Sequence, residues 1–534
     1  MPARVYKADL AQEPWDIVVI GSGIGGLSAA ALLAREGRRV LVLERHYVAG
    51  GFTHTFERKG YQWDVGIHYV GEMQRKNSVL RKVCDAVSGG RLAWAPMPEV
   101  YDRAVFLKEG GEEIYDFVAG RENLKARLKA YFPGETNAID RYFNLVDEVA
   151  RAARGYFMEK ALPPIPAAVA APFLRRRFLK LSDRTTWDVL SSLTKNEKLI
   201  GVLTTQYGDY GLPPRQSSFA IHAIVARHYF EGGSYPVGGA ESIAESVLPE
   251  IESAGGRVLV KAEVAEIFLE NGRAAGVRLS HGDEIRAKTV VSDAGVFNTF
   301  GKMLPSSLSE SLGLTRRLGQ VSPSLAHVCL YLGLKGTAAE HGLPAANFWV
   351  YPGYNHDANL ADYVRDFEAP LPVTYISFPS AKDPDWDRKR PETATMEAVG
   401  FVPYEWFRKW RGTPWKKRGS DYEDLKARLA ERLFENVYRM VPQIRGKVDY
   451  SEVSTPLTTR HFANYDHGEI YGLDHTPERF RLRWLRPRTP VPGLFLTGQD
   501  VASVGFGGAL MGGVLAASAV LGKDVLGAIL KKAS

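Results

Sequence analysis

The chain has 534 residues, of which 45% are hydrophobic and 11% aromatic, so it is long enough for more than one domain and can line a lipid-binding pocket. Its 68 Lys and Arg residues exceed the 61 Asp and Glu residues by seven, which is too small an excess to indicate a nucleic-acid-binding protein. Cys84 and Cys329 are too far apart to suggest a disulfide framework or a metal knuckle, and the N-terminus has no apolar signal segment, so we expect a cytoplasmic protein.

The first predicted elements form a strand, helix, strand unit. A β-branched run at residues 17–20 predicts a short buried strand, and the spacing of Leu and Ala over residues 27–34 predicts a helix that ends near Gly37. The run RRVLVLE at residues 38–44 predicts a second buried strand. This order is typical of the βαβ unit of a dinucleotide-binding domain.

The turn inside this unit carries the pattern G-x-G-x-x-G at Gly21, Gly23 and Gly26. The first glycine permits a tight turn, the second lets the backbone approach a pyrophosphate, and the third allows close helix packing. Glu44 closes the second strand 18 residues after Gly26, where it can accept hydrogen bonds from ribose hydroxyls. The spacing predicts an adenine dinucleotide but does not choose between NAD and FAD.

The continuation ERHYVAGGFTHTF, residues 44–56, favours FAD. Arg45 can meet the charge of a pyrophosphate, and Gly50 with Gly51 provides a second turn where the backbone can approach it. This added glycine pair resembles the large group of FAD-binding oxidoreductases that includes amine oxidases and carotenoid desaturases.

A basic amphipathic helix is predicted over residues 171–181. Such a helix can lie on an anionic membrane, and packing on the protein's own surface is the alternative. Its two arcs carry Phe173, Leu174, Phe178 and Leu181 on one side and Arg175, Arg176 and Lys180 on the other.

A second α/β stretch begins near Gly238. The segment GGAESIAESVLPEIESAGG predicts a helix, and residues 257–295 predict alternating strands. The turn signals between these strands are Asn271-Gly272 and His281-Gly282-Asp283.

A third α/β piece is the strand GLFLTGQD at residues 493–500 and the glycine-rich helix after it. Asp500 opens that helix, so its carboxylate can accept hydrogen bonds from ribityl hydroxyls. Residues 501–522 are uncharged, but their glycine content and the preceding strand favour a helix of a soluble protein over a membrane span.

These pieces predict an α/β fold with a discontinuous Rossmann-type FAD-binding domain and a second α+β substrate domain, as in amine oxidases and phytoene desaturases. The predicted limits are residues 1–75, 236–300 and 490–534 for the FAD-binding domain, and residues 76–235 and 301–489 for the substrate-binding domain.

Seven motifs narrow the resemblance, and they follow one another along most of the chain. They resemble the retinol saturase family and its bacterial members, which are in turn similar to carotenoid isomerases and phytoene desaturases. The motifs are DVGIHYVG (64–71), HYFEGGSYPVGGAESIA (228–244), SDAGVFNT (292–299), FPSAKDPDW (378–386), RGSDYEDLK (418–426), YGLDH (471–475) and LFLTGQD (494–500).

The resemblance implies a non-covalent FAD and the reduction of one C=C bond in a conjugated polyene. It also implies that Val264 lies where the related folds place strand backbone against adenine, and that His68 and Tyr69 lie where the chain returns toward the flavin ring. Saturation of a C=C bond needs a proton as well as a hydride, and His68, Tyr69 or Tyr235 can donate it. For His68, a hydrogen-bonded structural histidine is the alternative.

We therefore predict His68, Tyr69 and Tyr235 as catalytic residues and no metal site, because the His, Asp and Glu residues between 461 and 475 match no compact zinc pattern. No G-x-S-x-G motif supports a hydrolase. The predicted cofactor-binding residues are Gly21, Ser22, Gly23, Gly25, Gly26, Glu44, Arg45, Gly51, Thr53, Val264, Gly498, Asp500 and Leu510.

The predicted function is the FAD-dependent saturation of a C=C bond in a conjugated polyene lipid, such as a retinoid, a carotenoid or a related isoprenoid. The alternatives are a redox-neutral polyene isomerase, a carotenoid desaturase and, from another class, a non-catalytic lipid carrier. NAD(P)H is a candidate electron donor, peripheral membrane contact is expected, and the oligomeric state stays open.

Overall fold

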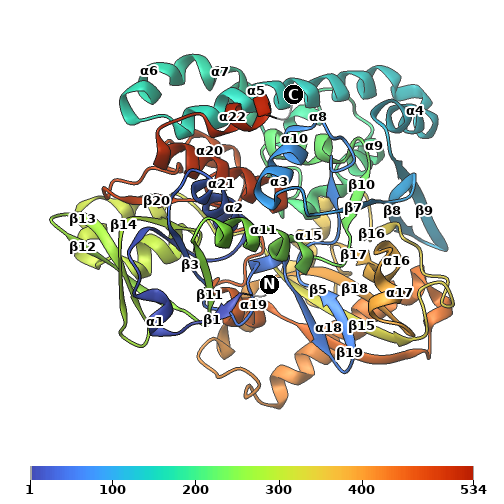
Figure 1. The fold of residues 1–534 in the computed structure, drawn as a ribbon. Coiled ribbons are helices and arrows are strands. Elements are labelled where there is room, and N and C mark those ends of the chain that lie inside the picture. Colours follow the sequence, from blue (N-terminus) through green and yellow to red (C-terminus); the bar gives the residue numbers. More distant parts are fainter. Residues whose placement is uncertain (1–2, 533–534) are drawn as a thin grey trace.

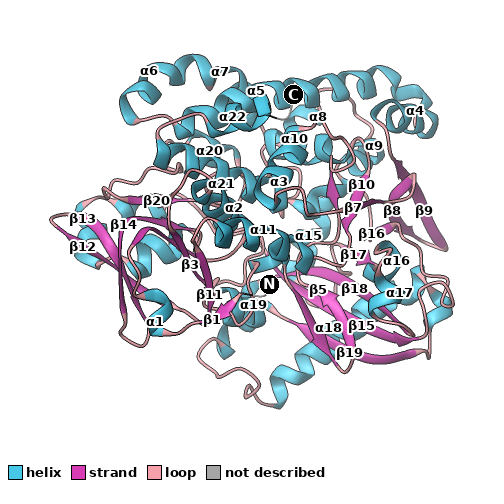
Figure 2. Ribbon diagram, in the orientation of Figure 1, coloured by secondary structure: helices cyan, strands magenta, loops and turns pink. Residues whose placement is uncertain are grey.

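The computed structural model describes residues 3–532, which form two large sheets with helical layers around them (Figure 1, Figure 2). The first sheet is parallel apart from a three-stranded antiparallel extension, and the second is antiparallel apart from one parallel pair. The edge of the first sheet at which its parallel strands end lies beside a large apolar compartment.

The first sheet has eight strands, and its central strands are buried because helices or further strands cover both faces. Their order is β1 (Arg4–Val5), β11 (Arg257–Val260), β3 (Val40–Leu43), β2 (Trp15–Ile20), β14 (Glu284–Ser292), β13 (Arg273–Leu279) and β12 (Val264–Glu270), with β20 (Leu494–Leu496) also pairing with β14.

Four helices pack together against this sheet: α2 (Ile24–Ala34), α3 (Val79–Ser88), α11 (Glu241–Ser253) and α21 (Gly505–Leu521). Every residue of α2 is buried between the sheet and α21. The approach of α21 to α2 requires glycine, because a Cβ on Gly513 would lie 2.5 Å from the Cβ of Ser28. The apolar, glycine-rich sequence of α21 is thus explained by burial inside the protein.

The second sheet has seven strands and separates two layers of helices. One face packs against α18 (Ser420–Met440), and the other faces a layer that contains α5 (Thr136–Ala161) and α10 (Phe219–Tyr229) (Figure 2). The strand order is β19 (Val448–Ser454), β15 (Ala326–Lys335), β18 (Thr393–Val402), β17 (Thr374–Ser377), β16 (Asn347–Tyr351), β8 (Val100–Lys108) and β9 (Gly111–Val118).

Two small sheets connect the large ones. The hairpin of β4 (Thr55–Arg58) and β5 (Tyr61–Asp64) packs on the second sheet, where the indole Nε1 of Trp63 donates a hydrogen bond of 2.9 Å to the carbonyl of Leu332. Shortly after it, β6 (Val70–Gly71) pairs with β10 (Gly233–Pro236), which also pairs with β7 (Trp94–Pro96). These pairings place residues 64–71 between the two large sheets.

The remaining helices are α1 (Ala8–Ala11), α4 (Arg121–Tyr131), α6 (Pro164–Leu174), α7 (Arg176–Ser182), α8 (Thr186–Leu190), α9 (Glu197–Leu203), α12 (Val296–Asn298), α13 (Ser306–Ser311), α14 (Leu314–Leu318), α15 (His356–Arg365), α16 (Pro379–Lys382), α17 (Trp386–Lys389), α19 (Pro456–Ala463), α20 (Pro477–Arg481) and α22 (Val525–Lys532).

The predicted βαβ unit is present as β2, α2 and β3, and the predicted turn at Asn271 and Gly272 joins β12 to β13 with positive φ at both residues. Each of the three segments predicted for the FAD-binding domain contributes strands to the first sheet. The exact domain limits stay a prediction.

The single amphipathic helix predicted over residues 171–181 is wrong. The helix breaks at Arg175, whose buried guanidinium donates a 2.7 Å hydrogen bond to the carbonyl of Phe480. Phe178 and Leu181 are buried in the core, whereas Phe173 is 81% exposed on α6. The charged and apolar residues of this segment therefore do not form two arcs of one surface helix.

Among the described residues, no single helix is long and apolar enough to span a membrane. α21 and α22 meet the length and composition requirement only as a pair, and the chain bends by 112° between them.

Candidate functional site

The carboxyl ends of five parallel strands meet at one edge of the first sheet. β2, β3, β11, β14 and β20 end there, and their following residues line a cavity of about 370 Å³, which we call the dinucleotide cavity. This edge is where open parallel sheets bind nucleotides. The lining includes Gly21, Glu44, Ala262, Asp293 and Thr497, one from the end of each strand.

The glycine turn after β2 lies against the loop after β14. Gly21 has a φ of +92°, which favours glycine, and a Cβ on Gly26 would lie 2.3 Å from the carbonyl oxygen of Gly21. A Cβ on Gly23 would lie 2.6 Å from Oδ2 of Asp293, and one on Gly25 would lie 2.5 Å from Cα of Gly498. α2 begins here without a side-chain cap, so its first N–H groups suit an anion such as a pyrophosphate.

Glu44 connects the two glycine turns. Its Oε2 accepts hydrogen bonds from the N–H (2.9 Å) and the hydroxyl (2.8 Å) of Ser22, and its Oε1 accepts one from the N–H of His46 (2.7 Å). The hydroxyl of Ser22 in turn accepts a 3.0 Å hydrogen bond from the N–H of Gly50. The predicted ribose-binding acid is thus held in a fixed orientation at the cavity wall.

The second glycine turn comes directly against the first. Gly51 has a φ of +56°, and a Cβ there would lie 2.9 Å from Cα of Gly23. Thr53 is buried and its hydroxyl donates a 2.8 Å hydrogen bond to the carbonyl of Gly50. The structure therefore brings Gly21, Gly23, Gly51 and Thr53 together as the sequence predicts.

Arg45 and Val264 also line the dinucleotide cavity. Arg45 donates hydrogen bonds to the carboxylate of Glu263 (3.2 Å) and to the carbonyl of His461 (2.8 Å), so its guanidinium is positioned by two partners at the cavity wall. Val264 is the first residue of β12 and is 6% exposed.

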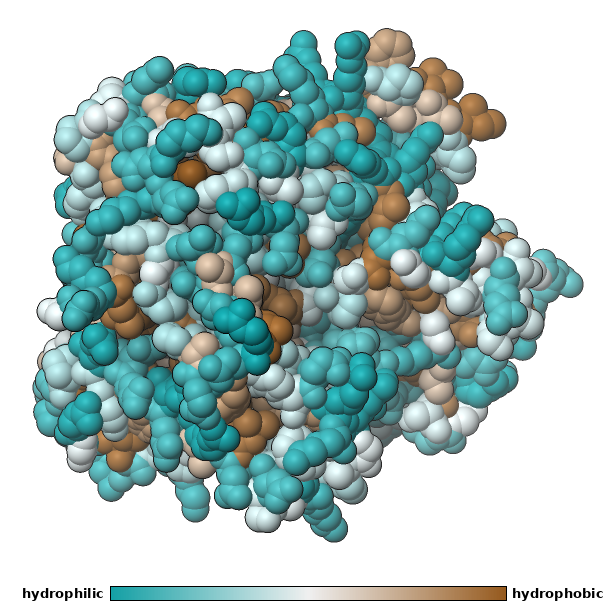
Figure 3. Space-filling view, turned by 180° about the vertical axis from the view of Figure 1, so that it is seen from behind, coloured by the Kyte–Doolittle hydropathy of each residue, from teal (hydrophilic) through white to brown (hydrophobic). Residues whose placement is uncertain are grey.

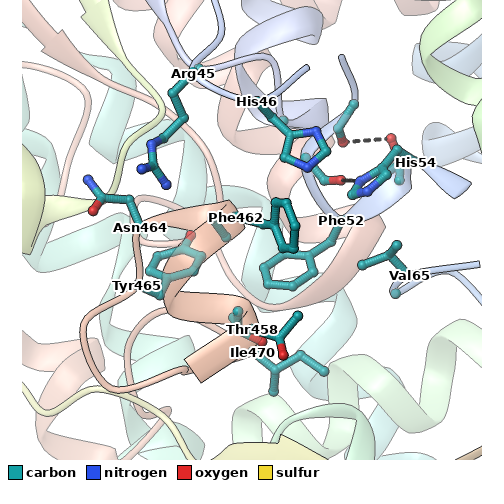
Figure 4. A pocket seen from close by; sticks show the side chains of 18 of the residues that line it. Arg45, His46, Phe52, His54, Val65, Thr458, Phe462, Asn464, Tyr465 and Ile470 are labelled. Carbon is teal, nitrogen blue, oxygen red and sulfur yellow. Dashed lines mark hydrogen bonds between the residues drawn. The ribbon is translucent and has the colours of Figure 1, made fainter. Parts of the chain in front are cut away.

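Aromatic side chains form another part of the wall. Figure 4 shows Phe52, Phe462 and Tyr465 pointing toward one another across the cavity, with Arg45 and His46 nearby. The rings of Phe52 and Tyr465 are stacked with their centroids 6.0 Å apart. Planar apolar groups of this kind suit the face of an aromatic ligand.

Asp500 lies after β20, next to Gly498, whose φ of +82° allows the tight turn. Its Oδ2 accepts a 2.9 Å hydrogen bond from the N–H of Val296, and its Oδ1 is buried without a well-formed hydrogen bond. A carboxylate oxygen at the cavity wall without a well-formed hydrogen bond fits a ligand that carries hydroxyl groups, as FAD does.

Asp293 is a site residue that the sequence reasoning missed. Its Oδ2 accepts a 2.9 Å hydrogen bond from the N–H of Gly26, and burial, with the charges of Glu44 and Asp500 adding to it, raises its pKa to about 8. A carboxyl group that is protonated at neutral pH does not repel an anion bound beside it. The sequence did contain a signal for this residue, because the motif SDAG stands at the end of a predicted strand. That strand ends at the same edge of the sheet as the glycine turn.

Four of the predicted cofactor residues are not part of the lining of the dinucleotide cavity, and they are Ser22, Gly26, Gly498 and Leu510. The first three belong to the glycine turns at its wall, whereas Leu510 is fully buried on α21, where its carbonyl accepts a 3.0 Å hydrogen bond from the hydroxyl of Ser28. Its position explains the packing of α21 on α2. A contact with the cofactor stays a prediction for this residue.

A second, larger cavity joins the first and encloses about 810 Å³. We call it the apolar cavity. It runs between the second sheet and the helices α3, α5, α21 and α22. The residues that line both cavities mark the junction, and they are Gly66, Ile67, Ile470, Tyr471, Gly505 and Phe506.

His68 and Tyr69 both line the apolar cavity close to this junction. The His68 side chain is 15% exposed, and burial, together with the charge of Lys382, lowers its pKa to about 4. The hydroxyl of Tyr69 donates a 2.8 Å hydrogen bond to Oδ2 of Asp102. Burial and the nearby carboxylates of Asp102 and Asp209 raise the pKa of Tyr69 well above its usual value.

Tyr235, predicted as a catalytic residue, is not part of the lining of either cavity, and a role in proton transfer stays a prediction for it. It is 1% exposed, and its hydroxyl donates a hydrogen bond to Oδ2 of Asp64 behind His68. The reason is its position on β10, the central strand of the small sheet between β6 and β7.

His327 is a second residue that the sequence did not indicate. It lies on β15, is 4% exposed, lines the dinucleotide cavity and has a buried Nδ1 without a hydrogen-bond partner. A single histidine in an apolar strand carries no recognisable signal, because the strand pattern alone predicts a core residue.

Comparison with known proteins agrees with this geometry. Residues 24–521 match the model of the family of flavin containing amine oxidoreductases. The all-trans-retinol 13,14-reductase of Danio rerio is 38% identical over 535 residues, which cover 97% of this chain and 88% of that protein. The chloroplastic prolycopene isomerase 2 of an Oncidium hybrid cultivar is 26% identical over 518 residues, covering 93% and 83% of the two chains.

Among solved structures, cyclohexylamine oxidase from Brevibacterium oxydans IH-35A has a TM-score of 0.59 at 17% identity, with 97% of this chain and 99% of that chain covered. At this identity the likeness concerns the fold. The predicted α/β fold and the predicted resemblance to retinol saturases and carotenoid isomerases are confirmed.

We predict that Gly23→Val and Glu44→Ala lose bound flavin. The valine side chain would enter the space between the glycine turn and Asp293, and the alanine would release Ser22 and His46. The measurement is the flavin absorbance per mole of purified, folded protein. Gly134→Ala is the control, because a Cβ there meets no atom within 4 Å. Full flavin content in both site variants would contradict the assignment.

Proposed function

Because this chain belongs to the family of flavin-containing amine oxidoreductases, we propose that it is an FAD-dependent enzyme that saturates one C=C bond of a conjugated polyene lipid. The observation that carries the proposal is the junction of the two cavities at Gly66 and Tyr471. A dinucleotide that begins at Glu44 and extends along its cavity ends where an apolar chain in the second cavity can meet it.

The residues present fit FAD. Glu44 is placed for the adenosine ribose, the N-terminus of α2 and the two glycine turns for the pyrophosphate, and the carboxyl group of Asp500 for ribityl hydroxyls. When bound and reduced, FAD supplies hydride chemistry at the junction. Neither Cys84 nor Cys329 lines a cavity, in keeping with the non-covalent cofactor that we propose.

The substrate class follows from the apolar cavity. Its lining is dominated by apolar side chains from α5, α21 and α22, including Phe157, Met511, Val514 and Leu526, and by Leu162 directly after α5. A flexible polyene can bury its chain there. A retinoid, a carotenoid or a related isoprenoid fits this chemistry. Conjugation matters because charge that develops on addition of hydride to a C=C bond must be delocalised.

The second hydrogen of the product comes from a proton donor at the apolar cavity. His68 is an ionisable side chain that lines it near the junction, whereas the hydroxyl of Tyr69 is already engaged with Asp102. The apolar wall keeps water away from the reacting carbon, so a positioned side chain is needed to deliver the proton.

Three other functions use the same site. A redox-neutral isomerase is favoured by the similarity to prolycopene isomerase, and a desaturase would run the chemistry in the opposite direction. A lipid carrier would need the apolar cavity alone, and the intact glycine turns, Glu44 and Asp500 speak against it. The mass of the product separates reduction from isomerisation and desaturation.

NAD(P)H is the electron donor that we propose to test first, since a reductase must regenerate reduced flavin after each turnover. Addition of NADH or NADPH to the oxidised protein without oxygen should bleach the flavin absorbance. A flavin that stays oxidised with both dinucleotides would exclude them as direct donors.

We predict that the protein with chemically reduced flavin, mixed anaerobically with a polyene, forms a product heavier by two hydrogen atoms as the flavin reoxidises. His68→Ala should retain FAD but react about 10²-fold more slowly, the usual scale for losing a general acid. Stopped-flow absorbance and mass spectrometry measure the two quantities. A product of unchanged mass would make the enzyme an isomerase, and an unchanged rate in His68→Ala would make this histidine structural.

The contact with a membrane that we propose is made by α6. Its residues Ile165, Val169 and Phe173 are 79%, 69% and 81% exposed and recur every four residues, so they share one face of the helix. Figure 3 shows apolar side chains at the upper corner of the molecule, where α6 lies. A surface of this kind marks an interaction site.

The position of α6 suits a lipid substrate. It follows α5 through Leu162 and Pro163, which line the apolar cavity, so the exposed face adjoins the cavity mouth. Exposed basic side chains lie on α5, on α7 and after α21, and they are Arg151, Arg154, Arg176, Arg177, Lys180 and Lys523, of which Lys523 pairs with Glu36. Apolar insertion together with basic charge favours the surface of an anionic bilayer, and we propose a cytoplasmic protein that binds there peripherally.

We predict that the triple variant Ile165→Ser, Val169→Ser and Phe173→Ser binds anionic liposomes at least about tenfold more weakly, because it removes the inserting side chains. Vesicle co-sedimentation measures the binding. Ile114→Ser with Val364→Ser is the matched control, since these residues are 46% and 48% exposed on other elements. Equal loss in both variants, or none in the triple variant, would contradict docking through α6.

A further inference from the structure

A buried cluster of ionisable side chains lies behind His68, between the two large sheets. It contains two acids, Asp64 on β5 and Glu397 on β18, and one base, Lys382 on α16. All three are at most 6% exposed. Buried ionisable groups beside a cavity are frequent at functional sites.

We propose that Glu397 is a positioning residue that orients His68 and passes it the proton that His68 gives to the polyene. The inference rests on the proposed function and deepens it, since it assigns the source of the second hydrogen of the product.

The position of Glu397 suits this role. It lies in the middle of the second sheet, where it pairs with Tyr331 and Ser377, and its side chain is completely buried. Its Oε1 accepts a 2.7 Å hydrogen bond from the N–H of Asp64, which fixes the carboxyl group.

The other carboxyl oxygen of Glu397 faces the imidazole. Oε2 lies 2.7 Å from Nδ1 of His68, which is hydrogen-bonding distance, although the ring is not turned for a well-aligned hydrogen bond. His68 lines the apolar cavity, whereas Glu397 lines neither cavity. Of His68 and Glu397, only His68 can therefore contact a polyene in the apolar cavity, and Glu397 acts through the imidazole of His68.

The backbone of His68 is held independently. Nζ of Lys382 donates a 2.7 Å hydrogen bond to the carbonyl of His68, and further ones to Oδ1 of Asn347 (3.0 Å) and to the hydroxyl of Ser377 (2.6 Å). Loss of Glu397 alone leaves these bonds in place. A variant at Glu397 thus removes the contact with the imidazole without releasing the segment that carries it.

The charges of the cluster leave a proton on an acid at neutral pH. Burial raises the pKa of Glu397 to about 8 and that of Asp64 to about 7, while burial lowers the pKa of His68 to about 4. Burial also lowers the pKa of Lys382, to about 8, so at neutral pH the lysine carries its charge and balances one carboxylate. The second acid then stays protonated beside a neutral imidazole. The groups that face Glu397 or its imidazole partner are Asp64, Lys382, Tyr235, Cys329, Tyr331, His327 and Tyr375.

The step balances as a proton relay. The O–H bond of Glu397 breaks as an N–H bond forms at Nδ1 of His68, and the N–H bond at Nε2 breaks as a C–H bond forms at one polyene carbon. The other carbon receives the hydride that reduced FAD supplies, so the product gains two hydrogen atoms. The carboxylate left on Glu397 lies in the field of Lys382, which favours the charged form.

The test compares the pH dependence of polyene-driven flavin reoxidation in the wild type and in Glu397→Gln. The relay needs a proton on Glu397, so the wild-type rate should be full below its pKa of about 8 and should decline above it. Glutamine keeps the size of the side chain but releases no proton. We expect Glu397→Gln to retain FAD, to react about 10²-fold more slowly and to lose the alkaline decline.

Two further variants separate the relay from a structural role. Glu397→Asp restores a proton-releasing carboxyl group and should recover part of the rate and the alkaline decline. Glu113→Gln, at a partly exposed site on β9, should behave as the wild type. If Glu397 has only a structural role, Glu397→Gln will lose flavin or thermal stability, but its rate per bound flavin will keep the wild-type pH profile. That unchanged pH profile would overturn the proposal.

An NMR titration of the resting protein tests the relay independently of the reaction rate. In protein labelled with nitrogen-15 histidine, the His68 signal is assigned by its loss in His68→Ala. In the wild type the Nδ1 shift should change near pH 8 as Glu397 loses its proton, and in Glu397→Asp this change should move. An Nδ1 shift that does not change near pH 8 overturns the relay even if Glu397→Gln fails to fold. If the wild type forms no product heavier by two hydrogen atoms, it is the proposed function that fails.

Discussion

The hydrogen bond from the N–H of Asp64 to the carboxyl group of Glu397 attaches the β4–β5 hairpin to the second sheet. Asp64 is the last residue of this hairpin, which follows the second glycine turn. The bond therefore fixes the end of the hairpin to the middle of the second sheet. With the bond from the indole of Trp63 to Leu332, it sets where residues 66–69 pass between the two cavities. The distance from the nucleotide edge to the apolar compartment depends on this attachment.

The nucleotide edge depends on close backbone contacts in the same way. Gly51 approaches Gly23, Gly25 approaches Gly498, and the carboxyl group of Asp293 fills the space between the turns. The segments that follow β2, β3, β14 and β20 are thereby packed with no room for a side chain at these glycines, which leaves backbone N–H groups at the wall of the cavity. Glu44 then fixes the first two turns to each other through Ser22.

Burial has opposite effects in the two compartments. The apolar cavity gains stability from a bound hydrocarbon chain because both surfaces leave water. The ionisable cluster behind His68 loses hydration on burial, a cost that folding must offset elsewhere. A cluster of this kind is understandable where it sets the protonation of a group at a reaction site, and its position directly behind a cavity-lining histidine agrees with that interpretation.

The sequence by itself determined the βαβ unit, the two glycine turns, Glu44 and Asp500, because each depends on residues close in the chain: glycines with positive φ, an apolar strand and the acid at its end. Only the tertiary structure decided the rest of the site. Glu397 and His68 are 329 positions apart and meet because β5 packs on β18, and Asp293 meets Gly26 across 267 positions. Tyr235 and Arg175 look like site and surface residues in the sequence but are buried, since the burial of a side chain depends on what packs against it from distant segments.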